Sequence, residues 1–220
     1  ASSSIFSNES VKSYQTWKGI NLLSISSDEI YENIFVPLCI QVIIEKEKKA
    51  KLPPLFQKLQ LVHMTYDDEY HKISRANNNL FNFSALLKKY SGDACRMYFL
   101  SKPLDQDFIF NEAELASMKN LKKSIDEFFQ KPFCFEKQLD GDFKKCIEQC
   151  LKHLEEKDIY GYVETITGFF KEQLWNVSIT KEQGLIFVKL LYPICPFLAE
   201  DIYENIYHGK YLLSDDGWII

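Results

Sequence analysis

Apolar and polar residues follow two different patterns along the chain, and the change falls after Leu100. Before it, the short apolar run 20–25 is followed by polar residues suited to cap a helix. This arrangement predicts a buried strand and then a helix that reaches about residue 50. Residues 58–65 alternate between two faces and predict a second strand. We therefore expect a strand–helix–strand α/β segment with a parallel sheet over residues 16–70.

Beyond Leu100, apolar residues recur at the helical period of 3.6. The expected helices cover residues 111–130, 142–157, 158–175, 180–192 and 197–207. Asp158 and Thr180 are suited to cap two of them, and Pro193 and Pro196 force a break before the last. Amphipathic helices joined by short polar links predict an antiparallel bundle, with helices alone after Leu100. The fold class expected is an α/β segment followed by an all-α bundle, mostly α overall.

A link of about thirty residues joins these two parts. It begins with an asparagine-dense loop that carries two cations, Lys72 and Arg75, and continues as an amphipathic helix and a break at Ser91-Gly92. A loop of this kind, anchored by rigid elements, can close over an anion. We therefore expect three regions: residues 1–70, the link at 71–100, and the bundle at 101–220.

The link resembles two motifs of the class I aminoacyl-tRNA synthetases. The first family motif is Lys-Met-Ser-Lys-Ser (KMSKS) followed by a basic residue, Gly, Asn and two apolar residues. The second ends a helix with Tyr-Gly-Ala-Asp-x-x-Arg. The matching residues here are Lys72, Ile73, Ser74, Arg75, Ala76, Asn77, Asn78, Asn79, Leu80 and Phe81, and then Tyr90, Ser91, Gly92, Asp93 and Arg96. Arg75 stands where the family has its second lysine, and Asn78 where it has glycine.

A third motif extends the resemblance into the bundle. Residues 193–203 match a Pro-x-x-Pro-His-apolar-x-Glu-Glu signature of the leucyl, isoleucyl, valyl and methionyl branch, with Phe197 in the place of the usual His. Residues 54–59 and 103–108 are most similar to leucyl enzymes. The resemblance implies the C-terminal part of a Rossmann-like catalytic domain, followed by a helical anticodon-binding domain.

What the resemblance implies for chemistry centres on the loop. Adenylate formation moves charge toward pyrophosphate, so Lys72 and Arg75, with Ile73 and Ser74 between them, would bind ATP with Mg²⁺ in a complete enzyme. A solvated basic turn is the alternative reading. The family's His-x-Gly-His half is absent, because the four histidines stand alone in the sequence. We therefore expect no aminoacyl adenylate from this chain by itself.

Two other groups of residues have structural explanations. Gly92 can end one helix with positive φ, Asp93 can cap the next, and Arg96 lies one turn along on the same face. Cys146, Cys150 and His153 share a helical face and could supply metal ligands. Because the cysteines alternate with apolar residues, we interpret them as core and predict no metal site.

Composition and charge limit the function classes. The chain has 220 residues, 46% of them hydrophobic and 26% charged, with a net charge of −5. This charge argues against a surface that grips nucleic acid everywhere, but it permits a local basic face, for which Lys119, Lys122 and Lys123 are the candidates. Two functions stay open: a tRNA-binding module, or a structural subunit whose protein partner covers the missing catalytic half. Residues 45–51 are nearly all charged and should be solvated.

The sequence also bears on where the protein works. Most of the six cysteines lie in apolar helical patterns, and no signal-peptide pattern opens the chain. We expect a cytoplasmic or organellar-matrix protein that is not secreted. The apolar run 34–44 contains Pro37 and Gln41 and is shorter than the roughly 20 residues of a membrane span, so no membrane role is expected.

Overall fold

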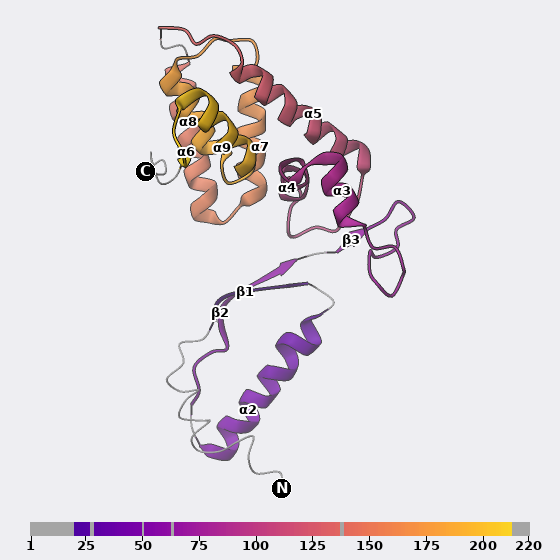
Figure 1. Ribbon diagram of the computed structural model, residues 1–220. Coiled ribbons are helices and arrows are strands. Elements are labelled where there is room, and N and C mark those ends of the chain that lie inside the picture. The colour runs from indigo at the N-terminus through magenta and orange to yellow at the C-terminus, as the bar shows by residue number, and fades with distance from the viewer. Residues whose placement is uncertain (1–19, 27–28, 50, 63, 137–138, 213–220) are drawn as a thin grey trace. The chain divides into compact units, whose positions relative to one another are not determined.

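The computed structural model describes residues 20–26, 29–49, 51–62, 64–136 and 139–212, and Figure 1 shows their helices and strands. Contacts divide the chain into two units. Unit 1 holds the described residues up to Tyr66 together with Leu104–Phe108, and unit 2 holds the described residues of 67–103 and from Ile109 onward. The link at 71–100 therefore lies in the same unit as the helices that follow it.

Unit 1 is built on two parallel strands, β1 (Ile20–Ser26) and β2 (Phe56–Val62). Ile20 pairs with Phe56 and Ser26 with Val62. Between the strands run a π-helical turn, η2 (Tyr31–Phe35), and helix α2 (Val36–Lys48). The parallel pair predicted from the sequence is confirmed. The cap expected at residues 27 and 28 lies outside the described residues.

Glu45 is an exception to the solvated helix end that was expected at residues 45–51. Its carboxylate accepts hydrogen bonds from the Leu52 backbone N–H at 2.9 Å and from the Gln41 amide at 3.3 Å. The Gln41 amide also donates to the Pro53 carbonyl at 3.2 Å. Residues 46–49 and Lys51 are exposed, as expected, whereas Glu45 is partly buried and binds the chain where it returns toward β2.

A correction concerns strands after Leu100. β3 (Thr65–Tyr66) pairs with β4 (Phe108–Ile109), so the expectation of helices alone after Leu100 is wrong at this point. The Phe108 N–H donates to the Met64 carbonyl at 3.1 Å, and the Asp107 carboxylate accepts from the Met64 N–H at 2.7 Å. Two residues are too few to show the alternation that predicts a strand.

Unit 2 contains the remaining described helices. They are α3 (Phe83–Tyr90), α4 (Gly92–Leu100), α5 (Glu112–Phe129), α6 (Asp140–Glu156), α7 (Ile159–Phe169), π-helical η3 (Phe170–Leu174), α8 (Lys181–Leu191), α9 (Pro196–Ile202) and π-helical η4 (Tyr203–Tyr207). The two predicted caps are confirmed: Asp158 accepts from the Gly161 N–H, and Thr180 forms a capping box with Gln183. No helix in the described part of the chain is long and apolar enough to cross a membrane.

The core of unit 2 is aromatic. The Phe187 ring, fully buried, lies 5.8 Å from the Phe170 ring and 6.3 Å from the Phe129 ring, measured between centroids. Cys146 and Cys150 of α6 are buried in the same cluster. This core explains why α5 to α9 pack as one body, since their apolar stripes converge on it.

Candidate functional site

The candidate nucleotide loop, residues 67–82, is organised by one carboxylate. One oxygen of Asp67 accepts from the backbone N–H groups of His71 at 2.7 Å and Glu69 at 3.2 Å. The other accepts from the Asn79 side-chain amide at 2.8 Å. These bonds, with Asn79 the largest cause, hold the pKa of Asp67 below its usual value. Asp67 thereby joins the two ends of the loop.

Two asparagine side chains then fix the backbone of the motif. The Asn79 amide oxygen accepts from the Ser74 N–H at 2.9 Å, and its nitrogen donates to the Lys72 carbonyl at 3.2 Å. The Asn77 amide donates to the same carbonyl at 2.7 Å. Sequence reasoning missed these roles, although the density of asparagines before Leu80 was a usable signal, because Asn side chains stabilise turns.

Asn78 occupies the tightest part of the loop. Its backbone has a φ of 53°, in the left-handed region, and its N–H donates to the Arg75 carbonyl at 3.1 Å. The family motif has glycine at this position, and asparagine tolerates positive φ better than most other residues. The turn after Arg75 is therefore formed with a side chain in place of a hydrogen atom.

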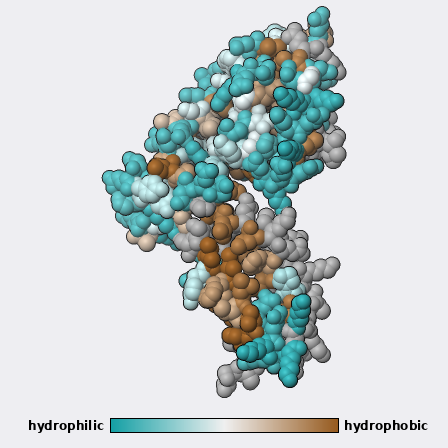
Figure 2. Space-filling view, turned by 180° about the vertical axis from the view of Figure 1, so that it is seen from behind, coloured by the Kyte–Doolittle hydropathy of each residue, from teal (hydrophilic) through white to brown (hydrophobic). Residues whose placement is uncertain are grey.

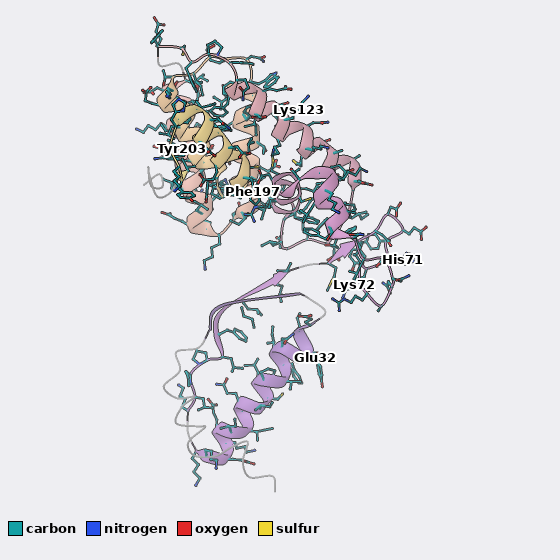
Figure 3. The ribbon with its side chains drawn as sticks, viewed as in Figure 1. Glu32, His71, Lys72, Lys123, Phe197 and Tyr203 are labelled. Atoms are coloured by element: carbon teal, nitrogen blue, oxygen red, sulfur yellow. The ribbon has the colours of Figure 1, made fainter. Side chains whose placement is uncertain are left out.

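The two cations of the loop differ in their exposure to solvent. Lys72 is partly buried, whereas Arg75 is exposed and forms no ion pair with any described residue. Figure 3 labels Lys72 beside His71, whose ring nitrogen lies 3.6 Å from the carboxylates of both Asp67 and Glu69. Ile73 and Ser74 between the cations are partly buried. The loop thus carries two positive side chains on a fixed backbone, an arrangement that can attract an anion.

Asp93 and Arg96 act on a segment about 100 residues away. Asp93 accepts from the backbone N–H groups of Phe197 at 3.3 Å and Leu198 at 2.8 Å, and so caps α9. Arg96 donates to the carbonyls of Pro193 at 2.8 Å and Ile194 at 3.3 Å. Two charged side chains of α4 therefore hold both sides of the turn that begins α9, and we call this contact the α4–α9 latch.

The latch corrects the expected roles of Gly92 and Asp93. Ser91, not Gly92, has the positive φ, of 79°, and the Ser91 hydroxyl accepts from the Ala94 N–H to cap α4. Asp93 is left to cap another helix. Gly92 instead allows a close approach, since a Cβ there would lie 3.3 Å from the Phe197 ring. The roles of Gly92 and Asp93 depend on Phe197 and Leu198, which are distant in sequence, so the local pattern could not assign them.

The three candidate lysines for tRNA lie together on α5. With Lys88 and Lys89 at the end of α3 they line a groove of about 320 Å³, which we call the lysine groove. Its other lining residues are Leu87, Tyr90, Ser91, Asn120 and Asp126. Sequence reasoning missed the two lysines of α3, because only the packing of α3 on α5 brings them to the groove.

The cysteine–histidine face does not form a cluster. Cys146 and Cys150 are buried in the core, whereas His153 is only partly buried and pairs with Asp158, with 2.8 Å between its Nδ1 and a carboxylate oxygen. Among the described residues, no three His, Cys, Asp or Glu side chains gather where they could hold a metal ion.

Comparison with known proteins shows sequence similarity to aminoacyl-tRNA ligases. The chain is 21% identical to a leucine–tRNA ligase of Buchnera aphidicola subsp. Cinara cedri over 81% of this chain and 24% of the relative. It is 22% identical to a valine–tRNA ligase of Sulfolobus acidocaldarius over 63% of this chain and 21% of that protein. The chain therefore spans less than a quarter of the length of these relatives. No family model matches it.

A solved structure gives the fold. The LeuRS of Agrobacterium radiobacter K84, in a crystal structure of a ternary complex with tRNA and LeuAMS, matches with a TM-score of 0.72 and 15% identity. The match covers 90% of this chain and 29% of that one. The chain is thus similar to part of a leucyl-type class I synthetase, and its mostly helical fold with a small parallel sheet is similar to the LeuRS fold.

Proposed function

We propose that this chain is the C-terminal part, or a truncated relative, of a leucyl-type class I aminoacyl-tRNA synthetase that binds tRNA and contributes the loop at Lys72–Arg75 to an ATP site. The observation that carries the proposal is the fold likeness over 90% of the chain. In this proposal residues 1–70 derive from a Rossmann-like catalytic domain, and residues 101–220 form an anticodon-binding-like bundle. By itself the chain would not aminoacylate tRNA.

The loop fits a triphosphate in its chemistry. Lys72 and Arg75 supply positive charge, and the hydrogen bonds from Asn77 and Asn79 hold the backbone between them, including Ile73 and Ser74. Bound ATP would supply the α-phosphorus that an amino-acid carboxylate attacks, with pyrophosphate leaving. The two cations would favour the charge that develops on the leaving group. Mg²⁺ would bind together with the phosphates, because proteins usually hold this ion through substrate phosphates and water rather than through protein ligands alone.

Exchange of labelled pyrophosphate into ATP tests this part of the proposal. The chain alone should give no amino-acid-dependent exchange, whereas a longer polypeptide that includes a His-x-Gly-His half should exchange. In that longer protein Lys72→Ala or Arg75→Ala should reduce exchange by about tenfold or more, as expected when transition-state charge loses a partner. Lys144→Ala, on the exposed face of α6, is the matched control. Exchange by the chain alone would refute the expected dependence on the other half.

Binding of tRNA is tested by titration at two salt concentrations. Contacts to phosphates release counterions, so affinity should fall as salt rises. Replacing Lys119, Lys122 and Lys123 together by Ala should weaken binding. An affinity that does not change with salt, or that survives this triple change, would count against the bundle as the tRNA-binding surface.

A second function is favoured by the apolar surface of unit 1. Figure 2 shows hydrophobic side chains gathered on this unit. Tyr31 is 66% exposed, Val42 60% and Ile43 50%, and Leu59 of β2 is also exposed. This alternative is a catalytically inactive, synthetase-like subunit, in which a protein partner covers the surface. It would replace the tRNA proposal if no tRNA bound at low salt while the chain co-purified with a protein partner in stoichiometric amount.

A further inference from the structure

An exposed aromatic ring lies against the residue that follows one of the groove's lining residues. Phe197, the second residue of α9, is 66% exposed. Its ring lies against Gly92, the neighbour of Ser91, which lines the groove. Figure 3 labels Phe197 and Lys123 within unit 2. The exposed phenyl ring of α9 therefore lies on the start of α4, one residue from the groove that the five lysines of α3 and α5 line.

The backbone at Phe197 is held in place, although the ring is exposed. Asp93 accepts a hydrogen bond from the Phe197 N–H, and Gly92 leaves just enough room for the ring to lie on the start of α4. Because the latch holds the backbone on both sides of the turn, stacking of a flat group on the ring needs no ordering of the main chain there. An exposed phenyl group beside cations is a typical platform for stacking a nucleobase.

Three of the five lysines already have partners. Lys89 lies 2.8 Å from the Glu112 carboxylate, Lys119 donates to the Lys89 carbonyl at 2.8 Å, and Lys123 lies 3.2 Å from Glu127. Lys88 and Lys122 form no ion pair within 4.0 Å with any described residue. Lys88 is exposed and Lys122 is partly buried. The charges of these two lysines are therefore less neutralised by ion pairs than those of Lys89 and Lys123.

Lys122 connects the groove to the ring. Its charge acts on the Asp93 carboxylate, which caps α9 at Phe197. A phosphate held by Lys122 would thus lie near the point where the Phe197 backbone is anchored. Asp126 is the one carboxylate among the described residues that line the groove, and Glu112 and Glu127 pair with Lys89 and Lys123. The groove therefore keeps a net positive charge, although the chain as a whole is acidic.

We propose that the lysine groove and Phe197 form one site for an RNA strand that contains an unpaired base. Lys88 and Lys122 contact successive phosphates of the strand, and Phe197 stacks on the unpaired base. This inference rests on the proposed function, since tRNA is the RNA in question. It adds the residues of α3 and α9 and a stacking contact, which phosphate binding by α5 alone would not need.

The salt dependence of binding separates the two kinds of contact. Total tRNA would be titrated against the full chain at several salt concentrations. Lys88→Ala with Lys122→Ala should lower the magnitude of the slope of log affinity against log salt by about 1.4, because each single-strand phosphate contact adds roughly 0.7. Phe197→Leu should lower affinity about tenfold at every salt concentration and leave the slope unchanged, since stacking releases no counterions.

Matched controls lie elsewhere in unit 2. Lys144→Ala with Lys152→Ala removes two exposed lysines of α6, and Phe135→Leu changes a fully exposed phenylalanine outside the groove. Neither should change the affinity or the slope as much as the groove variants do. Phe197→Tyr should retain affinity, and this comparison with Phe197→Leu holds even if both variants alter stability slightly.

The outcomes distinguish the two proposals. If the unaltered chain does not bind tRNA at low salt, the proposed function fails and the groove site fails with it. If the chain binds tRNA with a clear salt slope but the groove variants match the α6 and Phe135 controls, tRNA binding stands and the groove site is refuted. If Phe197→Leu changes the slope in the same way as the lysine variants, the stacking role is refuted.

Discussion

Helices α2 and α8 show how the two units differ. Both are rich in apolar residues, yet none of the thirteen residues of α2 is buried, whereas six of the eleven in α8 are. Leu38 of α2 is 41% exposed and Leu191 of α8 is fully buried. An apolar pattern therefore shows that a helix has an apolar face. Whether that face is buried depends on the chain that packs around it.

The difference has an energetic consequence. A buried leucine contributes through area removed from water and through close packing, and an exposed one contributes little of either. In the described part of unit 1, the two parallel strands and α2 are also short of the covering layers that such sheets usually have. Unit 2 should therefore carry most of the stability of the chain.

The largest expected effect compares the same substitution in both units. Leu191→Ala should destabilise unit 2 by about 2–5 kcal/mol, because it leaves a cavity in the core. Leu38→Ala should change stability by no more than about 0.5 kcal/mol. Amide hydrogen exchange resolved by peptide measures each unit separately. A loss of similar size at Leu38 would show that α2 is covered in solution.

The next effect concerns the latch within unit 2. Asp93→Ala removes a buried helix cap and leaves the N–H groups of Phe197 and Leu198 without their acceptor, so unfolding of unit 2 should need about 2 kcal/mol less free energy. Asp93→Asn keeps an acceptor oxygen and should cost less. Exchange in α9 should rise while that in β1 and β2 stays unchanged. An equal rise of amide exchange in both units would contradict the assignment of the latch to unit 2.

The latch also predicts a pH dependence. Burial raises the pKa of Asp93, although two backbone hydrogen bonds oppose the shift. The folded state therefore binds the proton more tightly than the unfolded state. The contribution of this group to stability is present at low pH and is lost as pH rises from about 4 through the raised pKa. Denaturation at several pH values should show the stability of the unaltered chain falling relative to Asp93→Asn across that window.

The parts of the fold that follow from local sequence were predicted well. Periodicity located the helices, and the caps at Asp158 and Thr180 depend on residues three positions away. The partners of Asp93 and Arg96 lie about 100 residues further on, so no local pattern could reveal them. In the candidate site, the two cations of the loop were identified from the motif. The lysines of α3 were not, because the groove exists only once α3 and α5 pack.

A smaller effect tests a cap that was predicted locally. Thr180→Ala removes the oxygen that accepts from the Gln183 N–H at 3.2 Å and breaks the capping box of α8. We expect a loss of about 1 kcal/mol from unit 2, measured by urea denaturation. Thr180→Ser retains the hydroxyl and should recover most of that loss. If serine were as damaging as alanine, the buried methyl group rather than the cap would be the cause.

The smallest effect asks whether the candidate nucleotide loop shares the stability of unit 2, to which it belongs by contacts. Asn78 has a φ of 53°, so Asn78→Gly removes a steric cost in the folded loop but adds freedom to the unfolded chain. These two terms oppose each other, and the net change in stability should be a few tenths of a kcal/mol.

Asn78→Ala does not remove the steric cost of the positive φ, and it should weaken the loop by about 1 kcal/mol. Exchange of the Ser74 N–H, which donates to the Asn79 side chain, reports opening of the loop directly. If Asn78→Ala speeds this exchange while the amides of α8 are unaffected, the loop opens independently of the core. Equal acceleration of both would mean that the loop opens only when the whole of unit 2 unfolds.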